Sequence, residues 1–153
     1  MSTTASKTWY GAIVVAYRTS PLRVLLVENP LRRTVSLPSG AVEAGDHGSQ
    51  AAAAVRELQE ELGWEVAEAT LLPTALTHSF IYRADKPGRG GDHGSNQLFL
   101  LSADGLPEPA GSDAQAVHPT WVSATEAAAK LSFEDLRPLL RQAIAMIQDS
   151  DKS

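Results

Sequence analysis

The sequence predicts an α/β fold in which a mixed β-sheet is flanked by helices. Two short apolar runs, at residues 13–17 and 24–28, are typical of strands. An alanine-rich segment after them, and a later segment over 136–147, carry apolar residues at helical spacing. Strands that come before and after a helix indicate a sheet with helices packed against it.

Strands are expected on both sides of the first helix. Between residues 66 and 83 the apolar pattern is broken at Pro73, and proline cannot donate a backbone hydrogen bond within a sheet. This segment is therefore expected to hold two strands, the second over residues 75–83. The other strands are predicted over residues 9–18, 22–29, 34–37, 96–103 and 118–122.

Two helices are expected near the C-terminus. Ser123 and Glu126 have the spacing of a capping box, which predicts a helix that runs to Leu131. For the last helix, Asp135 is the expected N-cap. Pro138 then falls in the first turn, where a helix tolerates proline.

Three glutamates are predicted to lie on one face of the helix over residues 50–62. Glu57, Glu60 and Glu61 are three and four residues apart, and Gly63 is expected to end the helix just beyond them. Like charges at the negative end of the helix dipole each destabilise the helix by roughly a few tenths of a kcal/mol or more. A bound divalent cation would remove this repulsion.

The residue types favour a hard metal ion, because the ligands offered are oxygens and the chain has no cysteine. Magnesium or manganese is therefore the expected cofactor. The alternative is a solvated acidic face, since charge runs are usually surface features. In that interpretation the apolar stripe of the helix buries against the core and the acids lie largely on its other side; the stripe consists of Ala51, Val55, Leu58 and Leu62.

Length and composition predict one domain. A chain of 153 residues and 16.3 kDa can bury about two-thirds of its unfolded surface in a single core. We expect a flexible N-terminus over residues 1–8, a single domain over 9–148 and a polar tail over 149–153.

Charge and cysteine content narrow the function classes. A net charge of −5 argues against a general nucleic-acid-binding surface, which would be strongly basic. No apolar run has the length of a membrane span, and none has the features of a signal peptide. The absence of cysteine is compatible with a reducing cytosol, so a cytoplasmic location is predicted. A homodimer is left open.

Two basic segments are candidates for phosphate contacts. Residues 84–95 are rich in glycine and predict a mobile surface loop, in which Lys86 and Arg89 supply positive charge that could close over phosphates. Arg32 and Arg33 lie in a predicted turn, where their forked donors could reach a polyphosphate. The alternatives are an inert hairpin connection and a pair of solvated arginines.

The stretch from Gly40 to Trp64 resembles the Nudix box. Residues 56–64, Arg-Glu-Leu-Gln-Glu-Glu-Leu-Gly-Trp, match the second half of that signature at every specified position. Gly40 is also in place. Asp46 stands where the signature has a glutamate, and two extra residues separate it from Arg56.

The resemblance implies an α/β/α sandwich that hydrolyses a nucleoside diphosphate linked to another group. By this resemblance Glu57 and Glu61 are the principal metal ligands, and Glu60 contributes directly or through water. The backbone carbonyl of Ser39 matches the family's main-chain ligand. Arg56 orients a glutamate by a charge-assisted hydrogen bond.

The general base of the family lies either in the box or on a later loop. We expect Glu60 or Glu61 in this chain. The later-loop candidates are Asp113, Gln115 and His118, and this region has Gln115 where a glutamate is often expected.

Residues outside the box favour polyphosphate substrates. Tyr82 lies eighteen residues beyond Trp64, a spacing similar to that of dinucleoside polyphosphate hydrolases, whereas Pro73 lies too close to the box to match ADP-ribose hydrolases. We therefore predict a small-molecule nucleotide substrate, a nucleoside or dinucleoside polyphosphate. The alternatives are an ADP-ribose or nucleotide-sugar pyrophosphatase, an inactive Nudix-like regulatory domain that binds nucleotides, and an unrelated acidic-helix protein.

Overall fold

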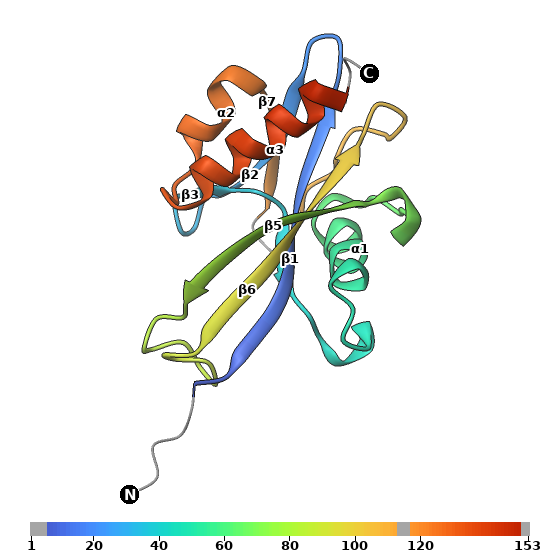
Figure 1. The fold of residues 1–153 in the computed structure, drawn as a ribbon. Helices are drawn as coiled ribbons and strands as arrows, with labels where there is room; N and C mark the ends of the chain where they lie inside the picture. The colour runs from blue at the N-terminus through green and yellow to red at the C-terminus, as the bar shows by residue number, and fades with distance from the viewer. Residues whose placement is uncertain (1–5, 113–116, 151–153) are drawn as a thin grey trace, which may run out of the picture.

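A computed structural model describes residues 6–112 and 117–150 as a mixed sheet with helices on both faces (Figure 1). The strand order is β3-β2-β1-β6-β5, with β4 paired to β1 and β7 paired to β2. The β1 and β6 strands are parallel, and the other pairs are antiparallel. The strands are β1 (Thr8–Arg18), β2 (Arg23–Asn29), β3 (Thr34–Ser36), β4 (Ser39–Ala41), β5 (Leu72–Ile81), β6 (His93–Ser102) and β7 (His118–Ser123).

Helix α1 (Gln50–Leu62) covers one face of the sheet, and α2 (Ala124–Lys130) with α3 (Leu136–Ser150) covers the other (Figure 1). An apolar core lies between the sheet and the helices on each face. Leu58 and Leu62 belong to the core under α1, and Leu140 and Ile144 belong to the core under α3. The predicted fold class, a mixed sheet flanked by helices, is confirmed. None of the helices in the described part of the chain is long and apolar enough to cross a membrane.

Helix α1 has the bounds that the sequence predicts. Its first turn is capped by Ser49, whose hydroxyl accepts a hydrogen bond from the Ala52 N–H at 3.0 Å. Gly63 ends the helix with φ of 70°, and its N–H donates to the Gln59 carbonyl. The glutamates near the end of α1 are therefore fixed at a sharply defined helix terminus.

The prediction of two strands between residues 66 and 83 is wrong. A short 3₁₀ turn, Glu68–Thr70, leads into the single strand β5, which contains Pro73. Proline is accepted there because β5 is an edge strand and its register against β6 is irregular between Pro73 and Thr77. The partner strand β6 begins at His93, so the glycine-rich connection is shorter than expected.

The capping box predicted at Ser123 does not form. Ser123 ends β7, and its hydroxyl lies 3.0 Å from that of Thr125 without capping the backbone of α2. Asp135, the predicted N-cap, directly precedes α3, and its carboxylate is 2.7 Å from Nε2 of His78 on β5. This contact fixes the start of α3 against the sheet edge.

Candidate active site

Arg56 is the centre of an ion-pair network on α1. Its Nη2 lies 3.1 Å from Asp46 and its Nη1 lies 2.7 Å from Glu57. Burial alone would lower the pKa of Arg56, but the hydrogen bonds to Asp46 and Glu57 raise it above its ordinary value. The remaining contacts are to Glu43 at 3.0 Å, Glu60 at 3.3 Å and the Ala41 carbonyl at 2.8 Å.

Asp46 connects the loop before α1 to this network. It lies in a 3₁₀ turn, Ala44–Asp46, and is buried, with one carboxylate oxygen accepting the Glu43 N–H at 2.8 Å. Hydrogen bonds from Arg56 hold the pKa of Asp46 below its ordinary value. His47 and Gly48 take left-handed conformations and carry the chain on to α1. The two extra residues are thus absorbed in a turn, and Asp46 still braces the loop against the helix.

The three predicted glutamates lie on one face, but they differ in exposure. Glu57 and Glu61 are buried, whereas the Glu60 side chain is 42% exposed. The interpretation of this face as a solvated acidic surface is therefore wrong for two of the three acids. It fails because Glu57 lies against β4 at Gly40 and Glu61 is buried as well.

Glu61 has an unusual environment. Its Oε2 is buried and has no hydrogen-bond partner among the described residues. Burial, followed by the negative charge of Glu57, raises the pKa of Glu61 to about 9, and burial also raises the pKa of Glu57. A buried carboxylate with a free oxygen and a raised pKa is a group whose charge requires a cation.

Gly40 allows Glu57 to approach β4. A Cβ atom at Gly40 would lie 2.2 Å from the Glu57 carboxylate, which is too close for any side chain. β4 pairs with β1 through Gly40 and Ala12, so the strand cannot move away freely. The backbone of Ser39 and Gly40 is thereby held next to the buried glutamates.

Gly40→Ala is therefore expected to reduce any activity of this site by at least about tenfold, because Glu57 must leave its position. The overpacking is also expected to destabilise the fold by roughly 1–3 kcal/mol. Steady-state kinetics and thermal unfolding measure the two effects. Gly45→Ala is the matched control, since a Cβ there meets nothing within 4 Å. Equal activity of the Gly40→Ala and Gly45→Ala variants would contradict the claim that activity depends on the close approach of Glu57 to Gly40.

The NUDIX domain family model matches residues 7–143. The chain belongs to the Nudix family. The match includes the whole sheet, α1 and the first half of α3, so the Nudix box identified in the sequence lies in the structural context that the family requires. No match is found among curated protein sequences.

Solved structures with the Nudix fold agree with this assignment. An Ap4A hydrolase from C. elegans in a binary complex is 20% identical, with 93% of this chain and 98% of that chain covered and a TM-score of 0.70. The dihydroneopterin triphosphate pyrophosphohydrolase of E. coli is 21% identical, with coverage of 88% and 92% and a TM-score of 0.70. A mutT/nudix family protein from Listeria innocua is 23% identical, with coverage of 96% and 98% and a TM-score of 0.64. At these identities the likeness concerns the fold.

A divalent metal ion of the kind used by the Nudix family fits the buried acids. No three acidic or histidine side chains converge as a preformed cage in the residues that the structure describes. Magnesium, however, is typically held by one or two carboxylates together with substrate phosphates and water. Glu57, Glu61 and the Ser39 carbonyl offer such an oxygen set, and the unpartnered oxygen of Glu61 is the observation that supports it.

Two adjoining cavities share part of their walls, and one of them includes Ser39. The first, here the inner cavity, has a volume of about 320 Å³ and includes Ser39 in its wall. The second, here the outer groove, has a volume of about 830 Å³ and contains Arg32, Tyr82 and Lys86. The two share Phe80, Ile81 and Phe133. Three of the five predicted substrate-binding residues are thus brought together in the outer groove, although they come from distant parts of the chain.

The other two predicted substrate-binding residues lie elsewhere. The Arg89 guanidinium stacks over the Trp9 ring at 4.3 Å and donates to the Tyr82 hydroxyl at 3.1 Å, so it supports the loop and does not line the groove. Arg33 is exposed and is not part of either cavity wall. Asp92 further organises this loop by accepting the Trp9 Nε1–H at 2.9 Å.

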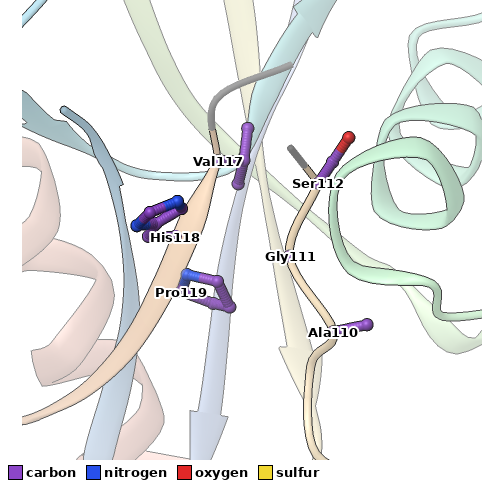
Figure 2. Close-up of a pocket in the computed structure, with 6 residues that line it drawn as sticks. All are labelled: Ala110, Gly111, Ser112, Val117, His118 and Pro119. Atoms are coloured by element: carbon purple, nitrogen blue, oxygen red, sulfur yellow. The ribbon is translucent and has the colours of Figure 1, made fainter. Parts of the chain in front are cut away.

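The later-loop candidates are only partly described. Asp113 and Gln115 lie outside the described residues. His118 lines a separate cavity of about 290 Å³ between the segments Ala110–Ser112 and Val117–Pro119 (Figure 2). This cavity shares no lining residue with the inner cavity or the outer groove.

Sequence reasoning missed several residues of the site. The structure adds Glu43 to the Arg56 network and places His78 and Asp135 in the wall of the inner cavity. The acidic residue at position 43 lies inside the Nudix box, but nothing in its spacing singles it out. His78 and Asp135 are 57 residues apart, and only the packing of α3 on β5 brings them together.

Proposed function

We propose that this Nudix protein is a magnesium- or manganese-dependent hydrolase that cleaves a phosphoanhydride bond in a nucleoside diphosphate linked to another group. The preferred substrate class is a nucleoside or dinucleoside polyphosphate. The observation that carries the proposal is the buried, unpartnered carboxylate oxygen of Glu61 beside Glu57, because it needs a cation and lies on the family's signature helix.

In this proposal Glu57, Glu61 and the Ser39 carbonyl hold the metal. The metal would neutralise phosphate charge and lower the pKa of a bound water. Arg56 keeps Glu57 in position through its 2.7 Å contact, and Asp46 in turn holds Arg56. Arg56 is therefore a positioning residue.

Glu60 is the preferred general base. Glu61 retains its proton near neutral pH when no cation is present, and it is a ligand when one is bound. Glu60 lies on the same helical face with an exposed carboxylate, so it can accept a proton from water and release it to solvent.

The outer groove supports a polyphosphate substrate. Arg32 and Lys86 give it positive charge, and Tyr82 adds an aromatic surface. Two of the structural neighbours are an Ap4A hydrolase and a dihydroneopterin triphosphate pyrophosphohydrolase, which by their names act on polyphosphate compounds. These observations favour a chain of three or more phosphates over ADP-ribose or a nucleotide sugar.

The test is phosphate or pyrophosphate release from nucleoside triphosphates, dinucleoside polyphosphates, ADP-ribose and nucleotide sugars with magnesium. We expect hydrolysis of nucleoside triphosphates and dinucleoside polyphosphates, and we expect a chelator to stop it. Turnover confined to ADP-ribose or nucleotide sugars would replace the substrate class. Nucleotide binding without turnover of any compound would favour a regulatory domain.

A further inference from the structure

The inner cavity has walls suited to a planar ring. Phe80 lies over Gly94, where a Cβ would be 2.2 Å from the ring, and His78 stacks on Phe80 with ring centroids 5.1 Å apart. Phe133, which is 45% exposed, lines the same cavity from the segment before α3. Aromatic walls of this kind bind nucleobases by stacking, without regard to base identity.

Base identity requires polar groups, and the inner cavity has one carboxylate, Asp135. His78 Nε2 lies 2.7 Å from Oδ2 of Asp135 and fixes the orientation of the carboxylate. The His78 side chain is mostly buried, whereas that of Asp135 is 60% exposed. An ionised carboxylate has about four lone-pair positions, so the contact with His78 leaves acceptor capacity on both oxygens.

We propose that Asp135 selects a nucleobase that presents two adjacent N–H donors, as guanine does with its ring N1–H and its 2-amino group. The two carboxylate oxygens match those two donors. Adenine instead offers one amino group beside the lone pair of a ring nitrogen, and a carboxylate repels that lone pair. This inference rests on the proposed function, since it assigns the base of the same nucleotide substrate.

The geometry leads to a specificity change that a structural role of Asp135 would not produce. Asp135→Asn keeps an oxygen that can accept from His78, but it replaces one acceptor by an amide donor. A side-chain amide has the donor and acceptor pattern that pairs with adenine. We expect the wild-type protein to prefer GTP over ATP by about 10- to 100-fold in kcat/KM, the discrimination typical of one bidentate contact. The Asn variant is expected to lose this preference or to favour ATP.

The experiment compares GTP, ITP and ATP in kcat/KM with magnesium, together with calorimetric binding of GMP and AMP. ITP lacks the 2-amino group and is expected to fall between the other two. Glu134→Gln is the matched control, because it removes the neighbouring exposed carboxylate, which is not part of the cavity wall. It should keep the wild-type preference.

The outcomes separate the base assignment from the proposed function. Hydrolysis of all three nucleotides at similar rates, or a guanine preference that Asp135→Asn leaves intact, overturns the base assignment alone. Selective GMP binding that depends on Asp135, without hydrolysis of any nucleoside or dinucleoside polyphosphate, supports the base assignment and overturns the proposed function. Failure to bind or hydrolyse any nucleotide overturns both.

Discussion

Glu61→Gln is expected to reduce hydrolysis by at least about a thousandfold and, at the same time, to stabilise the metal-free protein. The loss of activity follows from the removal of a charged metal ligand, which takes away several kcal/mol of charge stabilisation. The gain in stability follows from the burial of Glu61, whose ionised form is unfavourable in the absence of a cation.

The stability effect has a defined pH dependence. The pKa of Glu61 is about 9 in the folded protein, against an ordinary value of 4.5, so between these values the folded state holds a proton that the unfolded state has released. The free energy of unfolding of the metal-free wild type should therefore fall as pH rises from about 4.5 toward 9. Glutamine has no proton to lose. The variant should be more stable by about 4 kcal/mol near pH 7.5, or roughly 8–16 °C in Tm, and equal to the wild type below pH 4.5.

Thermal unfolding with chelator and with magnesium measures both parts of this expectation. Magnesium should raise the Tm of the wild type, because a ligand that binds only the folded state stabilises it, and should leave the Tm of Glu61→Gln nearly unchanged. Glu65→Gln, at an exposed position just beyond α1, is the control. A wild type whose metal-free Tm does not fall between pH 5 and 8.5 would argue against the buried acid described for position 61.

The parts of the site that depend on local sequence were predictable. Glu57, Glu60 and Glu61 lie on one face because helical spacing fixes their directions, and Gly63 ends the helix because glycine accepts a positive φ. The burial of Glu57 and Glu61 was not predictable in the same way. The burial of Glu57 involves the close approach of β4 at Gly40, which is a tertiary contact.

The parts that depend on distant contacts were missed or wrong. Pro73 predicts a strand break, and this prediction fails because the sequence does not show that β5 is an edge strand with an irregular register. The contact of His78 with Asp135 in the wall of the inner cavity was missed because these two residues meet only when α3 packs on the sheet. The stacking of the Arg89 guanidinium on Trp9 of β1 is a contact of the same kind, which the glycine-rich composition of the connection does not reveal.

Arg56→Ala is expected to affect both stability and activity, because Arg56 joins the loop before α1 to the acids on the helix. Removing it leaves the Asp46 carboxylate buried without its cation and leaves Glu57 free to turn away from its position. Breaking such a buried pair destabilises a protein by about 2–4 kcal/mol. We expect a loss of that size in the free energy of unfolding and a fall in kcat of about a hundredfold.

The loss of stability should itself depend on pH. Because Arg56 lowers the pKa of Asp46, their pairing stabilises the wild type above the ordinary pKa of aspartate, and the contribution disappears as pH falls through the lowered value. Urea unfolding should therefore show a large difference between the wild type and Arg56→Ala at pH 7 and a smaller one near pH 3.

Arg56→Lys keeps the charge but cannot contact Asp46, Glu57 and the Ala41 carbonyl at once, so it should recover only part of the stability and little of the activity. Arg141→Ala, on the exposed side of α3, controls for the loss of an arginine in general. If Arg56→Lys matched the wild type in kcat, positive charge alone would suffice at this position, and the forked geometry that holds Glu57 would have no part in the reaction.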